Sequence, residues 1–102
     1  MGLCIALQSE SGDRSELITD EKNVLDGLIG YPDWKEFPML ASIDRYGNTI
    51  FNRMQIKPLL AEWETLLSKA TTRDEQYLLA AVKSLGEKSQ RDVHQYLVFI
   101  GD

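Results

Sequence analysis

The segment Tyr96-Leu97-Val98-Phe99-Ile100 is apolar on both of its alternating faces. Successive side chains of a β-strand point to opposite faces of the sheet, so a strand with this pattern must be covered on both sides. Leaving either face in water would cost about 25 cal/mol per Å² of apolar surface. An edge position would also leave an apolar strand open to pairing with other chains. We therefore expect residues 96–100 to form an interior strand.

The N-terminal part of the chain offers further strands. Leu3 to Gln8 is an apolar run of strand length, and the turn-forming residues Ser9 to Asp13 follow it. Arg14 to Ile18 can return beside this run as a weaker strand. The first and last strands can pair in the centre of the sheet.

The strongest local signal is the turn Asp44-Arg45-Tyr46-Gly47. Asp and Gly suit the first and fourth positions of a type I turn, with a left-handed backbone at Gly47. The turn predicts a β-hairpin over residues 39–53, in which the segment 39–44 pairs with the segment 48–53.

Capping residues and apolar spacing predict three helices. Asp20 can cap a short helix that Gly30 ends. Pro58 suits the first turn of a second helix, which we expect to begin between Met54 and Lys57. The capping box Thr72-Arg-Asp-Glu75 then opens a third helix. Gly86 is expected to close this third helix.

These elements predict an α+β fold. The sheet is expected to be small and largely antiparallel, built from the hairpin 39–53 and the N-terminal and C-terminal strands, with three helices mainly on one face. A chain of 102 residues suits one domain, residues 1–102, because a second core would need roughly twice the length.

Composition excludes several function classes. The formal net charge is −5, which disfavours binding to nucleic acid phosphates. One cysteine and one histidine exclude an internal disulfide framework and a His-rich metal site, and the seven glycines match neither a dinucleotide fingerprint nor a phosphate loop. We expect no cofactor and no metal. The sequence shows no secretory signal and no membrane span, so we expect a cytoplasmic protein.

The sequence allows one catalytic arrangement, and the same residues also have a structural interpretation. Cys4, Asp92 and His94 would supply a nucleophile, an orienting carboxylate and a base if the first and last strands pair. Nothing in the sequence supplies the environment that a reactive thiolate needs. We therefore interpret Cys4 as a buried core residue and His94 as a surface residue at a strand entrance.

Candidate binding residues gather in the aromatic loop, residues 31–38, which lies between two prolines. Its aromatic side chains can anchor a partner on the surface, or they can fold inward as a lid that keeps the loop ordered. The loop length favours inward packing. Its carboxylates suit an acid and base pair or an ordinary solvated loop. The candidate residues are Tyr31, Asp33, Trp34, Glu36 and Phe37.

The strand face that carries Leu97 and Phe99 needs a cover of its own. If the helices cover only one face of the sheet, this second face is an apolar patch. It is then buried either by a second copy of the chain, giving a homodimer, or by the first helix and the aromatic loop.

The distribution of charge suggests a function. Residues 1–44 carry nine acidic and three basic side chains, a net charge of −6, whereas the remainder is net +1. We therefore expect a noncatalytic acidic module that binds a protein partner, with a basic protein as the candidate. One concrete form is an immunity-protein-like inhibitor of a basic toxin or nuclease. The alternative is a small enzyme or small-molecule-binding domain that uses Asp33, Trp34 and Glu36.

Overall fold

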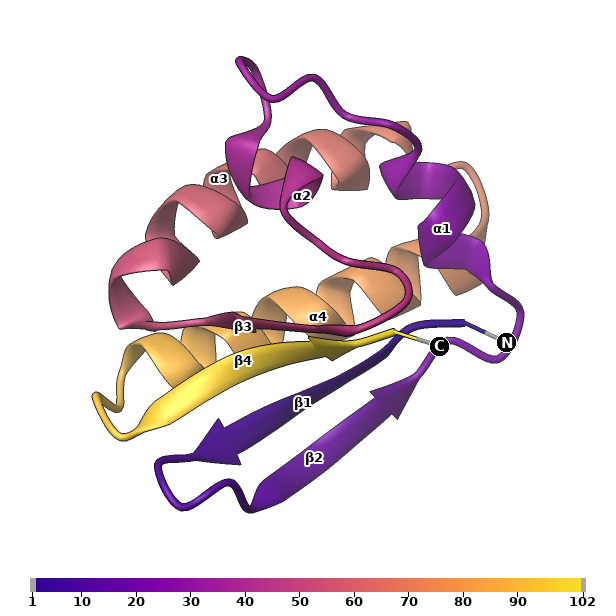
Figure 1. The fold of residues 1–102 in the computed structure, drawn as a ribbon. Coiled ribbons are helices and arrows are strands. Elements are labelled where there is room, and N and C mark those ends of the chain that lie inside the picture. Colours follow the sequence, from indigo (N-terminus) through magenta and orange to yellow (C-terminus); the bar gives the residue numbers. More distant parts are fainter. Residues whose placement is uncertain (1, 102) are drawn as a thin grey trace.

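The computed structural model describes residues 2–101 and contains one antiparallel sheet with helices packed on one face (Figure 1). The spatial order of the strands is β2-β1-β4-β3. The strands are β1 (Cys4–Ser9), β2 (Arg14–Thr19), β3 (Asn48–Phe51) and β4 (Gln95–Ile100). The helices are α1 (Val24–Ile29), α2 (Pro38–Ala41), α3 (Arg53–Lys69) and α4 (Arg73–Gln90). The expected α+β class is confirmed, with one helix more than predicted.

Strand β4 is an interior strand, as its apolar pattern predicts. It pairs antiparallel with β1 on one side and with β3 on the other. In this register Leu97 lies beside Leu7 and Phe51, and Val98 lies beside Ala6 and Ile50. The two apolar faces of β4 therefore extend onto both neighbouring strands.

The predicted hairpin over residues 39–53 is wrong in its first half. Residues 38–41 form α2 instead of a strand, and β3 pairs with β4. Pro38 occupies the first turn of α2, where its fixed φ suits a helix and its missing N–H is no loss. The side chain of Glu62, on α3, accepts hydrogen bonds from the backbone N–H groups of Met39 and Leu40. This distant cap satisfies two of the N–H groups that the first turn of a helix leaves without a partner.

The turn at residues 44–47 is present, but the left-handed backbone predicted at Gly47 is wrong. Its backbone does not lie in the left-handed region, which the glycines Gly12 and Gly30 occupy. A Cβ atom at Gly47 would lie 2.7 Å from Oδ2 of Asp44. A side chain at this position would therefore require the Asp44 carboxylate to move.

The cap of α1 is confirmed, although the helix begins later than its sequence suggests. The buried carboxylate of Asp20 accepts hydrogen bonds from the N–H groups of Val24 (2.9 Å) and Leu25 (2.7 Å). Asn23 adopts a left-handed backbone between the cap and the first helical residue.

The two long helices differ from the prediction at two residues. Helix α3 begins at Arg53, after a capping box of Asn52 and Gln55, so that Pro58 lies inside the helix beyond its first turn. Gly86 does not end α4, which continues to Gln90. It is buried against α3, where an added Cβ atom would lie 3.0 Å from the side chain of Leu60.

The capping box that opens α4 is confirmed. The side chain of Thr72 accepts a hydrogen bond from the backbone N–H of Glu75, and the Glu75 carboxylate accepts bonds from the N–H groups of Thr71 and Thr72. The hydrogen bond from the Thr71 N–H, followed by that from the Thr72 N–H, lowers the pKa of Glu75 below its ordinary value.

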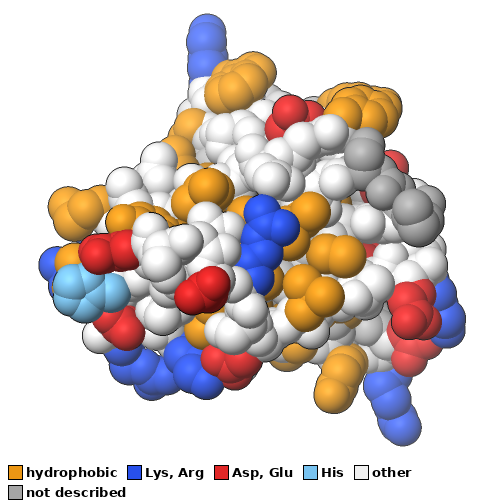
Figure 2. Space-filling view, turned by 60° about the horizontal axis from the view of Figure 1, so that its bottom comes forward, with side chains coloured by type: hydrophobic (Ala, Val, Ile, Leu, Met, Phe, Trp, Pro, Cys, Tyr) orange, Lys and Arg blue, Asp and Glu red, His pale blue; other side chains and the backbone are white. Residues whose placement is uncertain are grey.

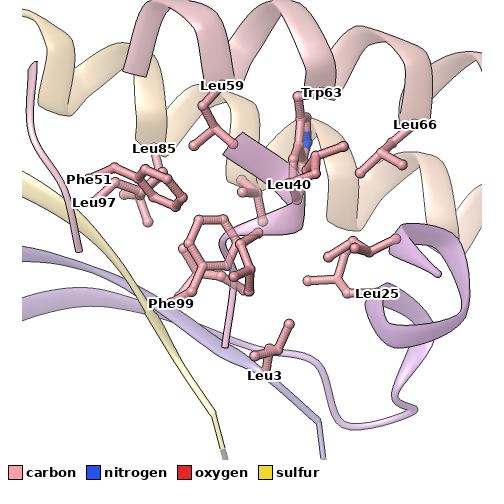
Figure 3. Packing of buried hydrophobic residues seen from close by; sticks show 14 of the residues in the cluster. Leu3, Leu25, Leu40, Phe51, Leu59, Trp63, Leu66, Leu85, Leu97 and Phe99 are labelled. Atoms are coloured by element: carbon pink, nitrogen blue, oxygen red, sulfur yellow. The ribbon is translucent and has the colours of Figure 1, made fainter. Parts of the chain in front are cut away.

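The face of β4 that carries Leu97 and Phe99 is covered by the chain's own helices. The Phe99 ring lies between Trp63 of α3, at 5.9 Å between ring centroids, and Phe51 of β3, at 5.7 Å (Figure 3). Trp63 Nε1 donates a hydrogen bond to the backbone carbonyl of Leu79 on α4 (2.9 Å). Leu97 and Phe99 are therefore buried within a single chain. Their burial does not require a second copy, and the homodimer stays a prediction.

The opposite face of the sheet has no helix over it, and Figure 2 turns this side of the molecule forward. At its centre Ala6 and Val98 are buried by neighbouring side chains. The exposed apolar side chains on it, Leu17 and Ile50, lie on the two edge strands. Cys4, Tyr96 and Ile100, on the same face, are half-buried, so this face presents apolar side chains to solvent in part.

Within residues 2–101, no helix combines the length and the apolar character needed to cross a membrane.

At one end of the sheet, His94 and Glu10 form a contact between the loop before β4 and the loop after β1. Their Nδ1 and Oε1 atoms lie 2.8 Å apart. The hydrogen bond to Glu10, and then its negative charge, raise the pKa of His94 above its ordinary value.

We predict that Glu10→Gln returns the pKa of His94 toward about 6.5, the ordinary value. The raised pKa means that the folded state favours the protonated ring. The contact therefore stabilises the fold below the ordinary pKa, and this contribution is lost as the pH rises through the raised pKa. NMR titration of the single histidine measures both values. Equal pKa values in the two proteins would show that the contact is absent in solution.

Candidate functional site

The aromatic loop stands out between α1 and α2 (Figure 1) and is ordered by its own hydrogen bonds. Gly30 ends α1 with a φ of 61°, a conformation that favours glycine. The Asp33 carboxylate accepts a hydrogen bond from the N–H of Lys35 (3.1 Å). The Asp33 carbonyl accepts bonds from the N–H groups of Glu36 and Phe37. The loop therefore keeps a defined shape without regular secondary structure.

The three aromatic residues of the loop divide between its two sides. Phe37 is half-buried and packs against the core, as expected for a lid. Tyr31 is 98% exposed and Trp34 is 65% exposed. The expected inward packing is therefore correct for Phe37 and wrong for the other two, which present their rings to solvent.

A third exposed aromatic residue, Tyr46, joins them from the turn at residues 44–47. It is 86% exposed. Tyr31, Trp34 and Tyr46 line one hollow of about 400 Å³ between the loop and the turn. We call these three residues the aromatic surface. Sequence reasoning missed Tyr46, because only the fold brings the turn beside the loop.

Arg45 holds the parts of this surface together. Its Nη1 atom lies 2.7 Å from Oδ1 of Asp26 on α1, and its Nη2 atom donates a hydrogen bond to the Gly30 carbonyl. The guanidinium carbon also lies 5.2 Å from the centre of the Tyr31 ring, a cation–π arrangement. One half-buried side chain thus connects the turn, the end of α1 and the first ring of the aromatic surface.

Asp33 and Glu36 lie in a neighbouring hollow of about 410 Å³, between the loop, α1 and α3. We call it the acidic hollow. Trp34 lines the first hollow and is not part of this one. Asp33, Trp34 and Glu36, which the sequence suggested as one site, are therefore divided between two adjacent hollows. Tyr31 lines both of them.

Glu62 fixes the position of α2 behind these hollows. Its Oε2 and Oε1 atoms accept hydrogen bonds from the N–H groups of Met39 (3.1 Å) and Leu40 (2.9 Å). The carboxylate thereby caps a helix on a different part of the chain. No local sequence pattern predicts these two hydrogen bonds, because Leu40 and Met39 precede Glu62 by 22 and 23 residues.

The suggested arrangement of Cys4, Asp92 and His94 does not form. Cys4 pairs with Ile100 at one end of β4, whereas His94 precedes the other end. Cys4 is half-buried on the open side of the sheet, in contrast to the fully buried position expected, and its Sγ lies 3.9 Å from Thr19 Oγ1. Among residues 2–101, no group of three or more His, Cys, Asp or Glu side chains is arranged to hold a metal ion.

Comparisons of this chain with protein-family models, with curated proteins and with solved structures find no match. The aromatic surface and the acidic hollow are therefore the features of this chain that point to its function.

We predict that Glu62→Ala lowers the free energy of unfolding by about 1–2 kcal/mol, because two backbone donors of α2 lose a charged acceptor. Glu62→Gln keeps one acceptor oxygen and should cost less. Glu64→Ala is the matched control: it removes a carboxylate two residues further along α3 whose recorded partner is the surface residue Lys83, so its cost should stay below about 1 kcal/mol. Urea unfolding measures all three, and equal losses for both alanine variants would contradict the capping role.

Proposed function

We propose that this protein is a noncatalytic, acidic module that acts in the cytoplasm and binds a protein partner through the aromatic surface. The observation that carries the proposal is the joint exposure of Tyr31, Trp34 and Tyr46 around one hollow. Large aromatic side chains bury 150–250 Å² each when covered, so a partner that covers three of them gains a large apolar contribution.

The composition and the support of the surface favour a protein partner. Tyrosine, tryptophan and arginine are the residue types most enriched where binding energy is concentrated in protein interfaces. Arg45 contacts Tyr31, Asp26 and the Gly30 carbonyl, so part of the surface is held in place before binding. A surface that is ordered in advance loses less conformational entropy when the partner binds.

The charges around the aromatic surface favour a basic partner. Asp33, Glu36 and Asp44 are exposed in the loop and the turn, where Lys35 is the exposed basic residue. Residues 1–44 carry a net charge of −6. Beside the aromatic surface, three exposed carboxylates against one exposed lysine leave an excess of negative charge, which steers a positively charged protein toward it. An immunity-protein-like inhibitor of a basic toxin or nuclease is the concrete form that we propose, because an acidic surface can oppose a basic active site.

The acidic hollow supports a second candidate function, a small-molecule-binding domain or small enzyme. Its volume of about 410 Å³ lies in the range of ligand sites, and it contains the carboxylates of Asp33 and Glu36. Trp34 lies outside it. We rank this candidate second because the exposed aromatic rings need a larger cover than a ligand in this hollow would provide.

The combined substitution Tyr31→Ala with Trp34→Ala should abolish capture of the partner, because it removes two of the three aromatic anchors. Tagged wild-type and variant proteins would be used to purify partners from the native source. Tyr77→Ala is the matched control, since Tyr77 is 78% exposed but lies on α4. A basic protein retained by the wild type and the control but lost by the double variant supports the proposal. Retention of every captured protein by the double variant would overturn it.

A further inference from the structure

We infer that the acidic hollow receives a positively charged side chain, a lysine or an arginine, of the protein partner. This inference rests on the proposed function and names the chemical group that the site recognises. It follows from the floor of the hollow, its rim and the chain's own lysine beside it.

The floor of the hollow is apolar. Phe37 is half-buried there, and Leu40 and Leu66 are buried beneath it. The side chains of lysine and arginine carry an aliphatic stem, which packs on such a surface while the charged end stays near water. The floor therefore suits the stem and not the charge.

The rim of the hollow carries the groups that suit the charge. Asp33 and Glu36 are exposed there beside the Tyr31 ring. Oδ1 of Asp33 accepts the hydrogen bond from Lys35 N–H, whereas Oδ2 of Asp33 and both oxygens of Glu36 make no hydrogen bond or ion pair to any group within residues 2–101. Three carboxylate oxygens are thus open to a cation.

Lys69, in the last turn of α3, lines the same hollow and is the one basic residue in its lining. It forms no ion pair with Asp33 or Glu36. The lining therefore carries two negative charges and one positive charge, which leaves an excess of one negative charge. Lys69 repels an incoming cation, so its removal should strengthen binding while removal of the carboxylates should weaken it.

The direct test is an NMR titration of the whole protein with single-residue probes. N-acetyl-lysine methylamide and N-acetyl-arginine methylamide should perturb amide signals of residues 31–37 and 65–69. N-acetyl-norleucine methylamide has a similar stem without the charge and should bind at least about fivefold more weakly, the effect of one ion pair at about 4 Å in water. Equal binding of the norleucine probe would overturn the inference.

Substitutions that remove negative charges and a positive charge from the hollow provide a second test. Asp33→Asn combined with Glu36→Gln should weaken binding of the lysine probe at least about fivefold, whereas Lys69→Met should strengthen it about threefold. Glu87→Gln on α4 and Lys57→Met, about 18 Å from Lys69 along α3, make the same kinds of charge change away from the hollow and should alter binding less than twofold. Unchanged binding in both hollow variants would overturn the inference.

The same variants separate this inference from the proposed function. If Tyr31→Ala with Trp34→Ala loses the partner while Asp33→Asn with Glu36→Gln binds the partner with wild-type affinity, the aromatic surface stands and the assignment of the hollow is wrong. If the aromatic variant keeps the partner, the proposed function fails, whatever the probes show. Both sets of variants exchange exposed side chains, and urea unfolding verifies that each is folded.

Discussion

The contact between Phe99 and Trp63 is the point at which the sheet and the long helices meet. Phe99 lies on the interior strand β4, and the Trp63 ring reaches it from α3 at 5.9 Å between centroids (Figure 3). The indole N–H is satisfied by the Leu79 carbonyl of α4, so burial of the ring leaves no polar atom unpaired. This one side chain therefore fixes both long helices relative to the sheet.

The candidate site depends on that contact through α3. Glu62 directly precedes Trp63 and caps α2, while Lys69 lies in the last turn of the same helix and lines the acidic hollow. A shift of Trp63 in the core would move the cap of α2 and one wall of the hollow together. The rigid core thus determines the shape of a surface that lies outside it, which is how binding loops usually obtain a defined geometry.

The sequence predicts those features that depend on residues close together in the chain. The alternating pattern of residues 96–100 predicts an interior strand, and Thr72 with Glu75 predicts the start of α4, because each signal is complete within five residues. The hairpin over residues 39–53 fails because Glu62, 22 residues beyond Leu40, supplies the bonds that make residues 38–41 helical. In the candidate site, the loop residues could be named from sequence, but the outward position of Tyr31 and the contribution of Tyr46 depend on contacts of Arg45 with Asp26 and Gly30.

The same distant contacts explain why exposed aromatic rings and a stable fold coexist here. Glu62 and Arg45 are partly buried and bond to backbone groups of the segments that carry the site, so they support the loop without occupying its outer face. Because the support comes from behind, Tyr31, Trp34 and Tyr46 are not needed to cover the core, which Phe37 and Leu40 cover instead. Aromatic side chains that the core does not need can lie wherever a partner would contact them. A folded chain that leaves three large rings in water at one place forgoes their burial, and a partner that covers them recovers that free energy as affinity.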